Sequence, residues 1–135
     1  SKGLILIGSS HHQFARLLED LDDRSKRRFI EKRSKPTTWL VPSNDNIPPW
    51  ITGNHDSVAV RITKHPVAKG LCEVFGRPIV STSCNPQGAP PAISQSQVKE
   101  YFGDKLDYFV MGEIERMGSV SDIIDLKTNK VIRLG

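Results

Sequence analysis

The residues best suited to chemistry form a polar segment, Ser81-Thr82-Ser83-Cys84-Asn85-Pro86-Gln87-Gly88. It follows a predicted strand and combines hydroxyls and an amide with glycine and proline. In open α/β sheets ligands bind just outside the carboxyl ends of strands, where such a loop can surround a phosphate with hydroxyl and backbone N–H groups. Serine, asparagine, proline and glycine also form turns, so composition alone favours a polar turn, and a phosphate loop is the functional alternative.

Arg61 is the second candidate, because the pattern around it turns its side chain away from the core. In Ser57–Thr63 the apolar residues Val58, Val60 and Ile62 share one face of a strand, and Arg61 shares the other face with small residues. An arginine among small residues needs an anionic partner. That partner is either a bound carboxylate or phosphate, which a guanidinium can hold with two N–H groups, or an acidic side chain at the sheet edge.

The histidines and cysteines form no recognisable site. The four histidines lack the spacing of metal ligands. Cys72 and Cys84 make no C-x-x-C motif and have no histidine partner that would predict a thiol nucleophile. Neither a Walker A motif nor a dinucleotide glycine motif is present. The sequence therefore predicts no catalysis by a thiol or by a protein-bound metal.

Residues 24–35 form a strongly basic segment. They hold seven cations against Glu31, a local charge of +6, whereas the whole chain carries only +4. Clustered cations favour a polyanion such as RNA, because phosphate contacts supply most nonspecific affinity. A solvated basic helix face is the alternative interpretation. The predicted RNA-binding residues are Arg24, Lys26, Arg27, Arg28, Lys32 and Arg33.

These side chains must be positioned by strands that alternate with helices. Strands are predicted at 3–8, 37–41, 57–63, 78–81, 106–111, 120–126 and 131–134. Helices are predicted at 11–22 with Ser10 as N-cap, from Pro66 to Gly76, and from Ser94 to Phe102. The apolar run at 3–8 suits a strand buried on both faces. This order predicts an α/β fold with a mixed sheet.

The composition is that of one ordinary globular domain, expected to span residues 1–135. The chain is 37% hydrophobic and 25% charged, and its size allows a core that needs neither disulfides nor a structural metal. No apolar run approaches the roughly 20 residues of a transmembrane helix, so no membrane partner is expected. Two cysteines and the lack of a recognisable export signal predict a reduced, cytoplasmic location.

Five segments occur in the order found in one known family. They are Lys2–Ile7, Ser57–Pro66, Pro78–Gly88, Ser121–Asp125 and Val131–Gly135. Together they resemble the YrdC-like family of threonylcarbamoyl-AMP synthases, and most closely its short bacterial branch. The resemblance covers nearly the whole chain. It implies a twisted mixed sheet with helices and an open, concave, basic surface.

The resemblance also implies a nucleotidyltransferase of tRNA processing. Family members join L-threonine, bicarbonate and ATP into threonylcarbamoyl-AMP and pyrophosphate, and partner proteins pass the threonylcarbamoyl group to tRNA as N6-threonylcarbamoyladenosine. Mg²⁺ is the expected companion of ATP. The matching ATP-binding positions are Lys2, Ser57, Ser83, Asn85 and Arg133, and those lining the threonine pocket are Arg61, Ser81 and Ser121. No acid or base is assigned, since such a transfer needs alignment and charge neutralisation above all.

Three departures from the family pattern bear on activity. Many relatives have Gly-Pro-x-Thr where this sequence has Lys35–Thr38, and a histidine often stands at Ile7. The family's N-terminal strand and helix would lie before Ser1, so residues 1–135 alone are expected to be weakly active or inactive, whereas a form with that segment would be active. The alternative function is an RNA-binding module of tRNA or rRNA maturation, without catalysis.

Overall fold

The computed structural model of the chain describes residues 4–45, 47–52, 55–81, 90, 94–103 and 121–134. The chain divides into two compact units. Residues 1–81 together with 120–135 form the first unit, and residues 82–119 form the second.

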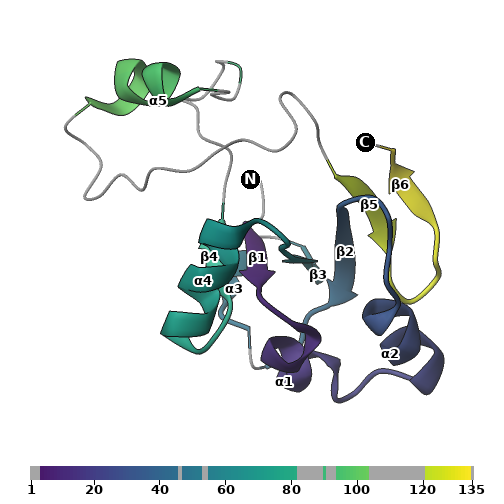
Figure 1. Cartoon of the computed structure of the whole chain (residues 1–135). Helices are drawn as coiled ribbons and strands as arrows, with labels where there is room; N and C mark the ends of the chain where they lie inside the picture. The colour runs from purple at the N-terminus through teal and green to yellow at the C-terminus, as the bar shows by residue number, and fades with distance from the viewer. Residues whose placement is uncertain are drawn as a thin grey trace. The chain divides into compact units, whose positions relative to one another are not determined.

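One mixed sheet organises the first unit (Figure 1), with the strand order β4-β1-β3-β2-β5-β6. The strands are β1 (Ile5–Gly8), β2 (Thr37–Pro42), β3 (Ser57–Ile62), β4 (Ile79–Ser81), β5 (Asp122–Asp125) and β6 (Val131–Arg133). β1 is parallel to β3 and β2 is parallel to β5, whereas the other three neighbouring pairs are antiparallel. The predicted α/β class is confirmed. The predicted strand at 106–111 lies outside the described residues.

The two faces of this sheet differ in character. The register aligns Leu6, Val60, Trp39 and Ile124 in one row across four strands, and all four side chains are buried. The full core comprises Leu6, Phe14, Leu17, Leu18, Phe29, Trp39, Val41, Ile51, Val58, Val60, Ile124 and Leu126. The alternation predicted for β3 is therefore confirmed, and Arg61 faces away from this core.

β1 differs from its prediction in one respect. It lies inside the sheet between β4 and β3. However, only Leu6 and Gly8 are buried, while Ile5 and Ile7 on the opposite face are half-buried. The prediction of burial on both faces was wrong, because an all-apolar run of four residues cannot distinguish a one-sided strand from a two-sided one.

The helix predicted at 11–22 is shorter and is divided in two. A 3₁₀ turn, η1 (His11–Phe14), leads into α1 (Ala15–Leu18). A Cβ on Gly8 would lie only 2.6 Å from the Phe14 ring, so Phe14 can approach β1 closely only because residue 8 is glycine. The tight turn seats Phe14 in the core at this point.

The cap of this helix also differs from the prediction. The Ser10 side chain makes no capping hydrogen bond. Instead, the backbone N–H of Ser9 donates to the side-chain oxygen of Gln13 at 2.8 Å. Gln13, within the 3₁₀ turn, thus binds back to the segment before the turn, and this bond does not replace the cap expected of Ser10.

Three further helices belong to the first unit: α2 (Asp23–Ile30), α3 (Pro49–Thr52) and α4 (Pro66–Phe75). α4 confirms its prediction, since the His65 side chain accepts from Val67 N and Gly76 ends the helix in the left-handed conformation with φ 77°. The short helix α3 was not predicted, and it contributes Ile51 to the core.

The second unit is described through α5 (Gln95–Phe102). The Ser94 hydroxyl accepts from the backbone N–H of Gln97 at 3.2 Å, as expected of an N-cap. Gly103 follows the last residue of the helix. The predicted helix is therefore confirmed.

Among the residues that the structure describes, no helix has the length and apolar character needed to cross a bilayer.

Substitution of Phe29 tests how strongly this residue anchors α2 to the core. Its side chain is 2% exposed and meets Phe14 edge to face at 5.7 Å between ring centroids. Phe29→Ala is expected to lower the free energy of unfolding by about 3–5 kcal/mol in urea denaturation, because it leaves a cavity. Ile30→Ala is the control, since Ile30 is 51% exposed, and should cost at most about 0.5 kcal/mol. Equal losses in the two variants would contradict this account of the core.

Candidate functional site

Four neighbouring strands bring side chains from distant segments into one row on the face opposite the core. Arg61 on β3 lies opposite Thr38 on β2, and Thr38 aligns with Ile123 on β5. Ile123 in turn lies opposite Arg133 on β6. Ser121 precedes Ile123 by two residues and so projects from the same face. The row gathers two arginines and two hydroxyls from four strands.

Hydrogen bonds connect this group directly. Arg61 Nε donates to Thr38 Oγ1 at 3.0 Å, and Arg61 Nη2 donates to Ser121 Oγ at 3.1 Å. The two hydroxyl oxygens are 2.7 Å apart and share a hydrogen bond of their own. Arg133 Nη2 donates to the backbone carbonyl of Ser121 at 2.8 Å. Arg61 is thereby fixed by neutral oxygens, and its remaining N–H groups can serve a ligand.

The site carries positive charge that the described residues do not neutralise. Burial lowers the pKa of Arg61, and the nearby charge of Arg133 lowers it further. The ion pair seen in the described part of the chain joins Arg33 to Asp122 at 3.6 Å and involves neither of these arginines. Two guanidiniums close together, one of them partly buried, favour an anion between them.

Asp122 directly follows Ser121, yet its carboxylate does not join the group. Alternation along β5 turns its side chain to the core face, where it is almost completely buried. There it pairs with Arg33, whose Nε also donates to Thr37 Oγ1 at 2.7 Å. The carboxylate of Asp122, the residue next to Ser121, therefore pairs with an arginine on the opposite face of the sheet.

Ser57 lies on the same face as Arg61 but four residues earlier, about 13 Å along β3. It lines a hollow of about 240 Å³ together with Leu4, Leu40, Ile51, His55 and Ala59. Most of the side chains that line this hollow are apolar, and the Ser57 hydroxyl is among the polar ones.

The other predicted site residues do not contact this group in the described part of the chain. Ser81 ends β4 and shares the face of Arg61, since both Ser81 and Ala59 align with Ile5. The predicted ATP positions Lys2, Ser83 and Asn85 lie outside the described residues. Arg61, Ser121 and Arg133 are thus brought into contact, and Ser57 and Ser81 lie on the same face at a greater distance.

Comparisons with known proteins identify the family of this chain. A family model named for Sua5, YciO and YrdC, and described as "Telomere recombination", matches residues 1–135. The chain belongs to this family. A protein of Cellvibrio japonicus called threonylcarbamoyl-AMP synthase is 48% identical over 132 residues, which cover 98% of this chain and 70% of the relative. The protein of the same name from Pseudomonas aeruginosa is 46% identical and is covered to 71%.

Solved structures of the Sua5/YciO/YrdC family share the fold. A double variant of P. abyssi Sua5 superimposes with a TM-score of 0.83 at 32% identity, covering 93% of this chain. P. abyssi Sua5 complexed with L-threonine gives a TM-score of 0.81 at 31% identity. This chain spans 39% and 36% of the length of those two chains.

Thr38 contacts two of the predicted site residues, although the sequence analysis did not assign it to the site. It is buried, accepts from Arg61 and contacts Ser121. The sequence gives one indication of this role. Thr38 occupies the position of the threonine in the Gly-Pro-x-Thr segment of many relatives, within the predicted strand 37–41. Thr38 holds Arg61 in place and is therefore a positioning residue.

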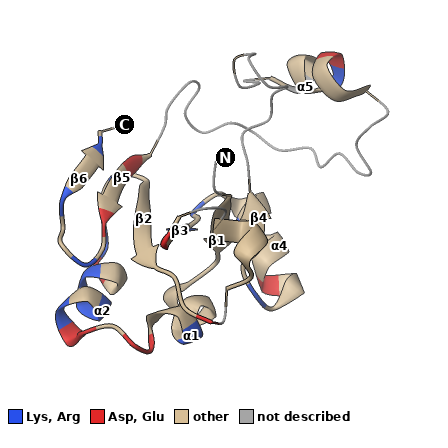
Figure 2. Ribbon diagram, turned by 180° about the vertical axis from the view of Figure 1, so that it is seen from behind, with Lys and Arg blue, Asp and Glu red and all other residues tan. Residues whose placement is uncertain are grey.

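The predicted RNA-binding residues lie on α2 and directly after it, and Figure 2 shows Lys and Arg positions along α2 in blue. Their contacts divide them into two groups. Arg28 donates to the backbone carbonyl of Leu126, and Arg33 pairs with Asp122 and lies over the Trp39 ring at 5.7 Å. These two arginines tie α2 and the segment after it to the sheet. The remaining predicted residues are Arg24, Lys26, Arg27 and Lys32, of which only Lys26 is not exposed.

Metal and thiol chemistry find no support in the described residues. Within the described ranges, no three histidine, cysteine or acidic side chains come together as metal ligands. Cys72 is buried, its Sγ donates to the Ile7 carbonyl, and burial raises the pKa of its thiol. It therefore has a structural role as a protonated thiol.

Anion binding tests the charge of this site. We expect pyrophosphate to raise the melting temperature, by the equivalent of about 2.7 kcal/mol when its concentration is about 100 times Kd. Arg61→Gln and Arg133→Gln should each reduce this shift, because each removes one of the two guanidiniums. Lys69→Gln, at an exposed position of α4 outside the site and the basic segment, is the control of equal charge. A shift that is the same in all four proteins would show that the anion binds elsewhere.

Proposed function

We propose that this chain is the threonine- and ATP-binding part of a threonylcarbamoyl-AMP synthase, forming threonylcarbamoyl-AMP and pyrophosphate from L-threonine, bicarbonate and ATP. The observation that carries the proposal is Arg61, a partly buried guanidinium that the hydroxyls of Thr38 and Ser121 hold, with no carboxylate among its partners in the described part of the chain. The curated relatives named for this reaction, at 46–48% identity, support it.

Threonine fits this environment by its own chemistry. Its carboxylate can accept two N–H groups of Arg61, a geometry that a guanidinium provides and an ammonium does not. Its hydroxyl can exchange hydrogen bonds with serine side chains, and we propose Ser121 and Ser81 for this role. P. abyssi Sua5, which was solved with L-threonine, has the same fold and supports the assignment.

We propose that ATP lies beside threonine, with Arg133 and Ser57 on its side of the site. Threonine and bicarbonate combine with loss of water into a carbamate on the threonine nitrogen. A carbamate oxygen then attacks the α-phosphorus of ATP, the bond from this phosphorus to the bridging oxygen breaks, and pyrophosphate leaves with both bonding electrons. Arg133 stabilises charge on the phosphates, and alignment of the two reactants supplies most of the acceleration.

The phosphate contacts of Lys2, Ser83 and Asn85 remain part of the proposal, as does Mg²⁺. Mg²⁺ prefers oxygen ligands and commonly binds through substrate phosphates and water. Hydroxyl and amide oxygens of Ser83 and Asn85 suit that ion chemically. When bound, Mg²⁺ would neutralise charge on the phosphates.

We further propose that the product is passed to tRNA through partner proteins of threonylcarbamoylation, in the cytoplasm. ATP and tRNA are available there, and the buried free thiol of Cys72 suits a reducing compartment. RNA binding without catalysis is the less favoured function, because the named relatives are enzymes and because Arg28 and Arg33 serve the fold.

Substitution of Arg61 tests the proposed reaction. Arg61→Ala should reduce threonine-dependent pyrophosphate release by about 100-fold, since charged hydrogen bonds contribute about 1.5–3 kcal/mol each. Arg61→Lys keeps the charge, loses the two-pronged contact and should give an intermediate loss. Thr38→Val should raise KM for threonine more than it lowers kcat. Arg16→Ala removes an equal charge outside the site and serves as control.

Calorimetric titration with threonine is the second measurement, because it needs no turnover. We expect binding in the unmodified chain and a loss of about 100-fold in affinity with Arg61→Ala. The assignment fails if Arg61→Ala binds threonine as tightly as the unmodified chain, or if pyrophosphate is released equally without threonine.

The exposed cations of the basic segment give a separate prediction. The triple variant Arg24→Glu, Arg27→Glu and Lys32→Glu should weaken RNA binding, and the slope of log affinity against log salt should fall by about 2–3, near 0.9 for each lost phosphate contact. A matched triple reversal of Arg16, Lys69 and Arg77 is the control. Filter binding at several salt concentrations measures both. Equal losses in the two triple variants would indicate nonspecific attraction and remove the assignment to this segment.

A further inference from the structure

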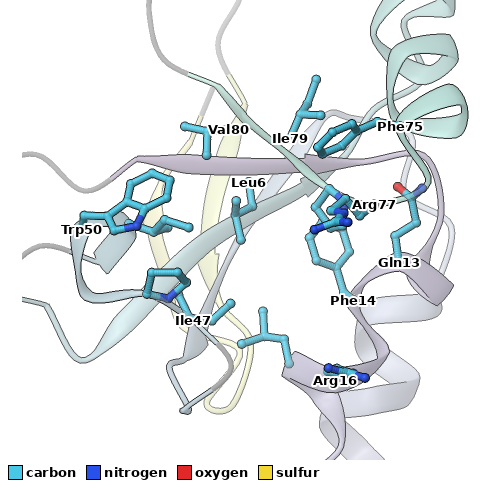
Figure 3. Close-up of a pocket in the computed structure, with 14 residues that line it drawn as sticks. Leu6, Gln13, Phe14, Arg16, Ile47, Trp50, Phe75, Arg77, Ile79 and Val80 are labelled. Carbon is cyan, nitrogen blue, oxygen red and sulfur yellow. The ribbon is translucent and has the colours of Figure 1, made fainter.

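The core face of the sheet differs in character on the two sides of β3. Beside β1 and β4 it borders a hollow of about 790 Å³, where Figure 3 shows Leu6 between Trp50 and Phe14. No acidic residue is among the described residues that line this hollow. On the other side of β3, at the start of β5, the same face carries the buried carboxylate of Asp122. A charge at this position of an otherwise apolar face needs an explanation.

The start of β5 connects this carboxylate to the candidate site. Ser121 projects toward Arg61, whereas Asp122 projects to the core face. The peptide group between them is held at both of its polar atoms. The N–H of Asp122 donates to the Pro36 carbonyl at 3.0 Å, and the Ser121 carbonyl accepts from Arg133 at 2.8 Å. A displacement of Asp122 therefore also displaces the Ser121 hydroxyl.

One guanidinium on the core face contacts the sequence neighbours of both hydroxyl residues of the site. Arg33 pairs with the carboxylate of Asp122 at 3.6 Å, and its Nε donates to Thr37 Oγ1 at 2.7 Å. Asp122 follows Ser121, and Thr37 precedes Thr38. Thr37 and Asp122 are aligned neighbours on β2 and β5, and both are buried. The guanidinium thus holds together the two strand segments that carry the hydroxyls.

Further hydrogen bonds fix Arg33 and its partner on β2. The backbone carbonyl of Arg33 accepts from Lys64 Nζ at 3.1 Å. Lys64 lies two residues after the end of β3, the strand that carries Arg61. Thr37 Oγ1, which accepts from Arg33, donates to the Lys35 carbonyl at 3.2 Å. These contacts join β2, β5 and the segment after β3 around one arginine.

The stability of the fold alone gives little reason for the pair of Arg33 and Asp122. Taking a carboxylate out of water costs free energy that its pairing does not always recover, and Asp122 is only 3% exposed. Apolar residues of similar volume often support a fold equally well at such positions. What the pair adds is a fixed spacing between two strand segments, because both charges must stay within contact distance.

We propose that Arg33 and Asp122 are positioning residues of the threonine site. They hold Ser121 and Thr38 at the spacing at which both hydroxyls accept from Arg61. The remaining N–H groups of that guanidinium then face the carboxylate of the ligand. Neither positioning residue touches the ligand in this role. The proposal rests on the proposed function only in naming threonine as the ligand.

Nuclear magnetic resonance of the Arg61 side chain tests the positioning without any ligand. The Nε–H of Arg61 donates to Thr38, so it should exchange slowly with water, and Arg61→Lys identifies its signal by removing it. Arg33→Gln and Asp122→Asn should each accelerate this exchange about tenfold, because each loosens the spacing of the two hydroxyls. Arg33→Lys keeps the charge and should accelerate the exchange less.

Arg28→Gln is the matched control. Arg28 donates to the backbone carbonyl of Leu126, the residue that follows β5. The control removes the same charge and a contact at the far end of this strand, and it should leave the exchange of the Arg61 Nε–H within twofold. Because Arg33 is exposed, Arg33→Gln is expected to fold, and it serves where Asp122→Asn does not fold by circular dichroism.

Calorimetric titration with threonine measures the consequence for the ligand. Arg33→Gln and Asp122→Asn should each lower the threonine affinity about tenfold, whereas Arg28→Gln should leave it unchanged. The double variant removes the carboxylate together with its cation, so its loss should not exceed the larger of the two single losses. A role in stability alone would lower the melting temperature and leave the affinity of the folded protein unchanged.

Two results would overturn the proposal. One is that exchange of the Arg61 Nε–H is unchanged in the folded variants of Arg33 and Asp122, or is accelerated equally by Arg28→Gln. The other is that this exchange accelerates while the threonine affinity stays the same. If the unmodified chain binds no threonine, the proposed function fails, and the exchange measurement still decides whether Arg33 and Asp122 position Arg61.

Discussion

The hydrogen bonds that join Arg61 to Thr38 and Ser121 depend on the register of three strands, and the rest of the site depends on them. Each bond links β3 to a different segment, one to β2 and one to the residue before β5. The same register aligns Val60 with Trp39 and Trp39 with Ile124 in the core. Since side chains alternate between the faces, packing of the core row fixes the polar row on the opposite side. Burial of apolar surface thus supplies the free energy that holds a partly buried cation in position.

Alternation also determines the sign of the charge in the site. Asp122 is adjacent to Ser121, yet its carboxylate lies on the core face and pairs with Arg33. A shift of β5 by one residue would place this carboxylate on the face of Arg61, where it would neutralise the guanidinium. The ion pair with Arg33 opposes that shift, because the shift would separate the Arg33 guanidinium from the Asp122 carboxylate. The ion pair of the core face therefore keeps this carboxylate away from the face of Arg61.

The sequence predicted local features well and non-local partners poorly, for a physical reason. The alternation of Val58 and Val60 placed Arg61 on the face opposite the core. The resemblance grouped Arg61 with Ser81 and Ser121 and assigned Arg133 to ATP. Neither predicted Thr38 as its support, because that contact requires β2 and β3 to be neighbours in the described register. The helix predicted after β1 failed for a similar reason, since its tight first turn depends on Phe14 packing against Gly8.

β1 connects the two faces of the sheet beside the candidate site. Leu6 is buried and aligns with both Val60 and Val80, whereas the next residue, Ile7, aligns with Arg61 on the other face. Packing on the core face therefore restrains the strand that borders Arg61. Because a guanidinium holds an anion through two N–H groups only in a defined orientation, small displacements of β3 against its neighbours would weaken such a contact. The order of the polar face is thus a consequence of packing on the core face.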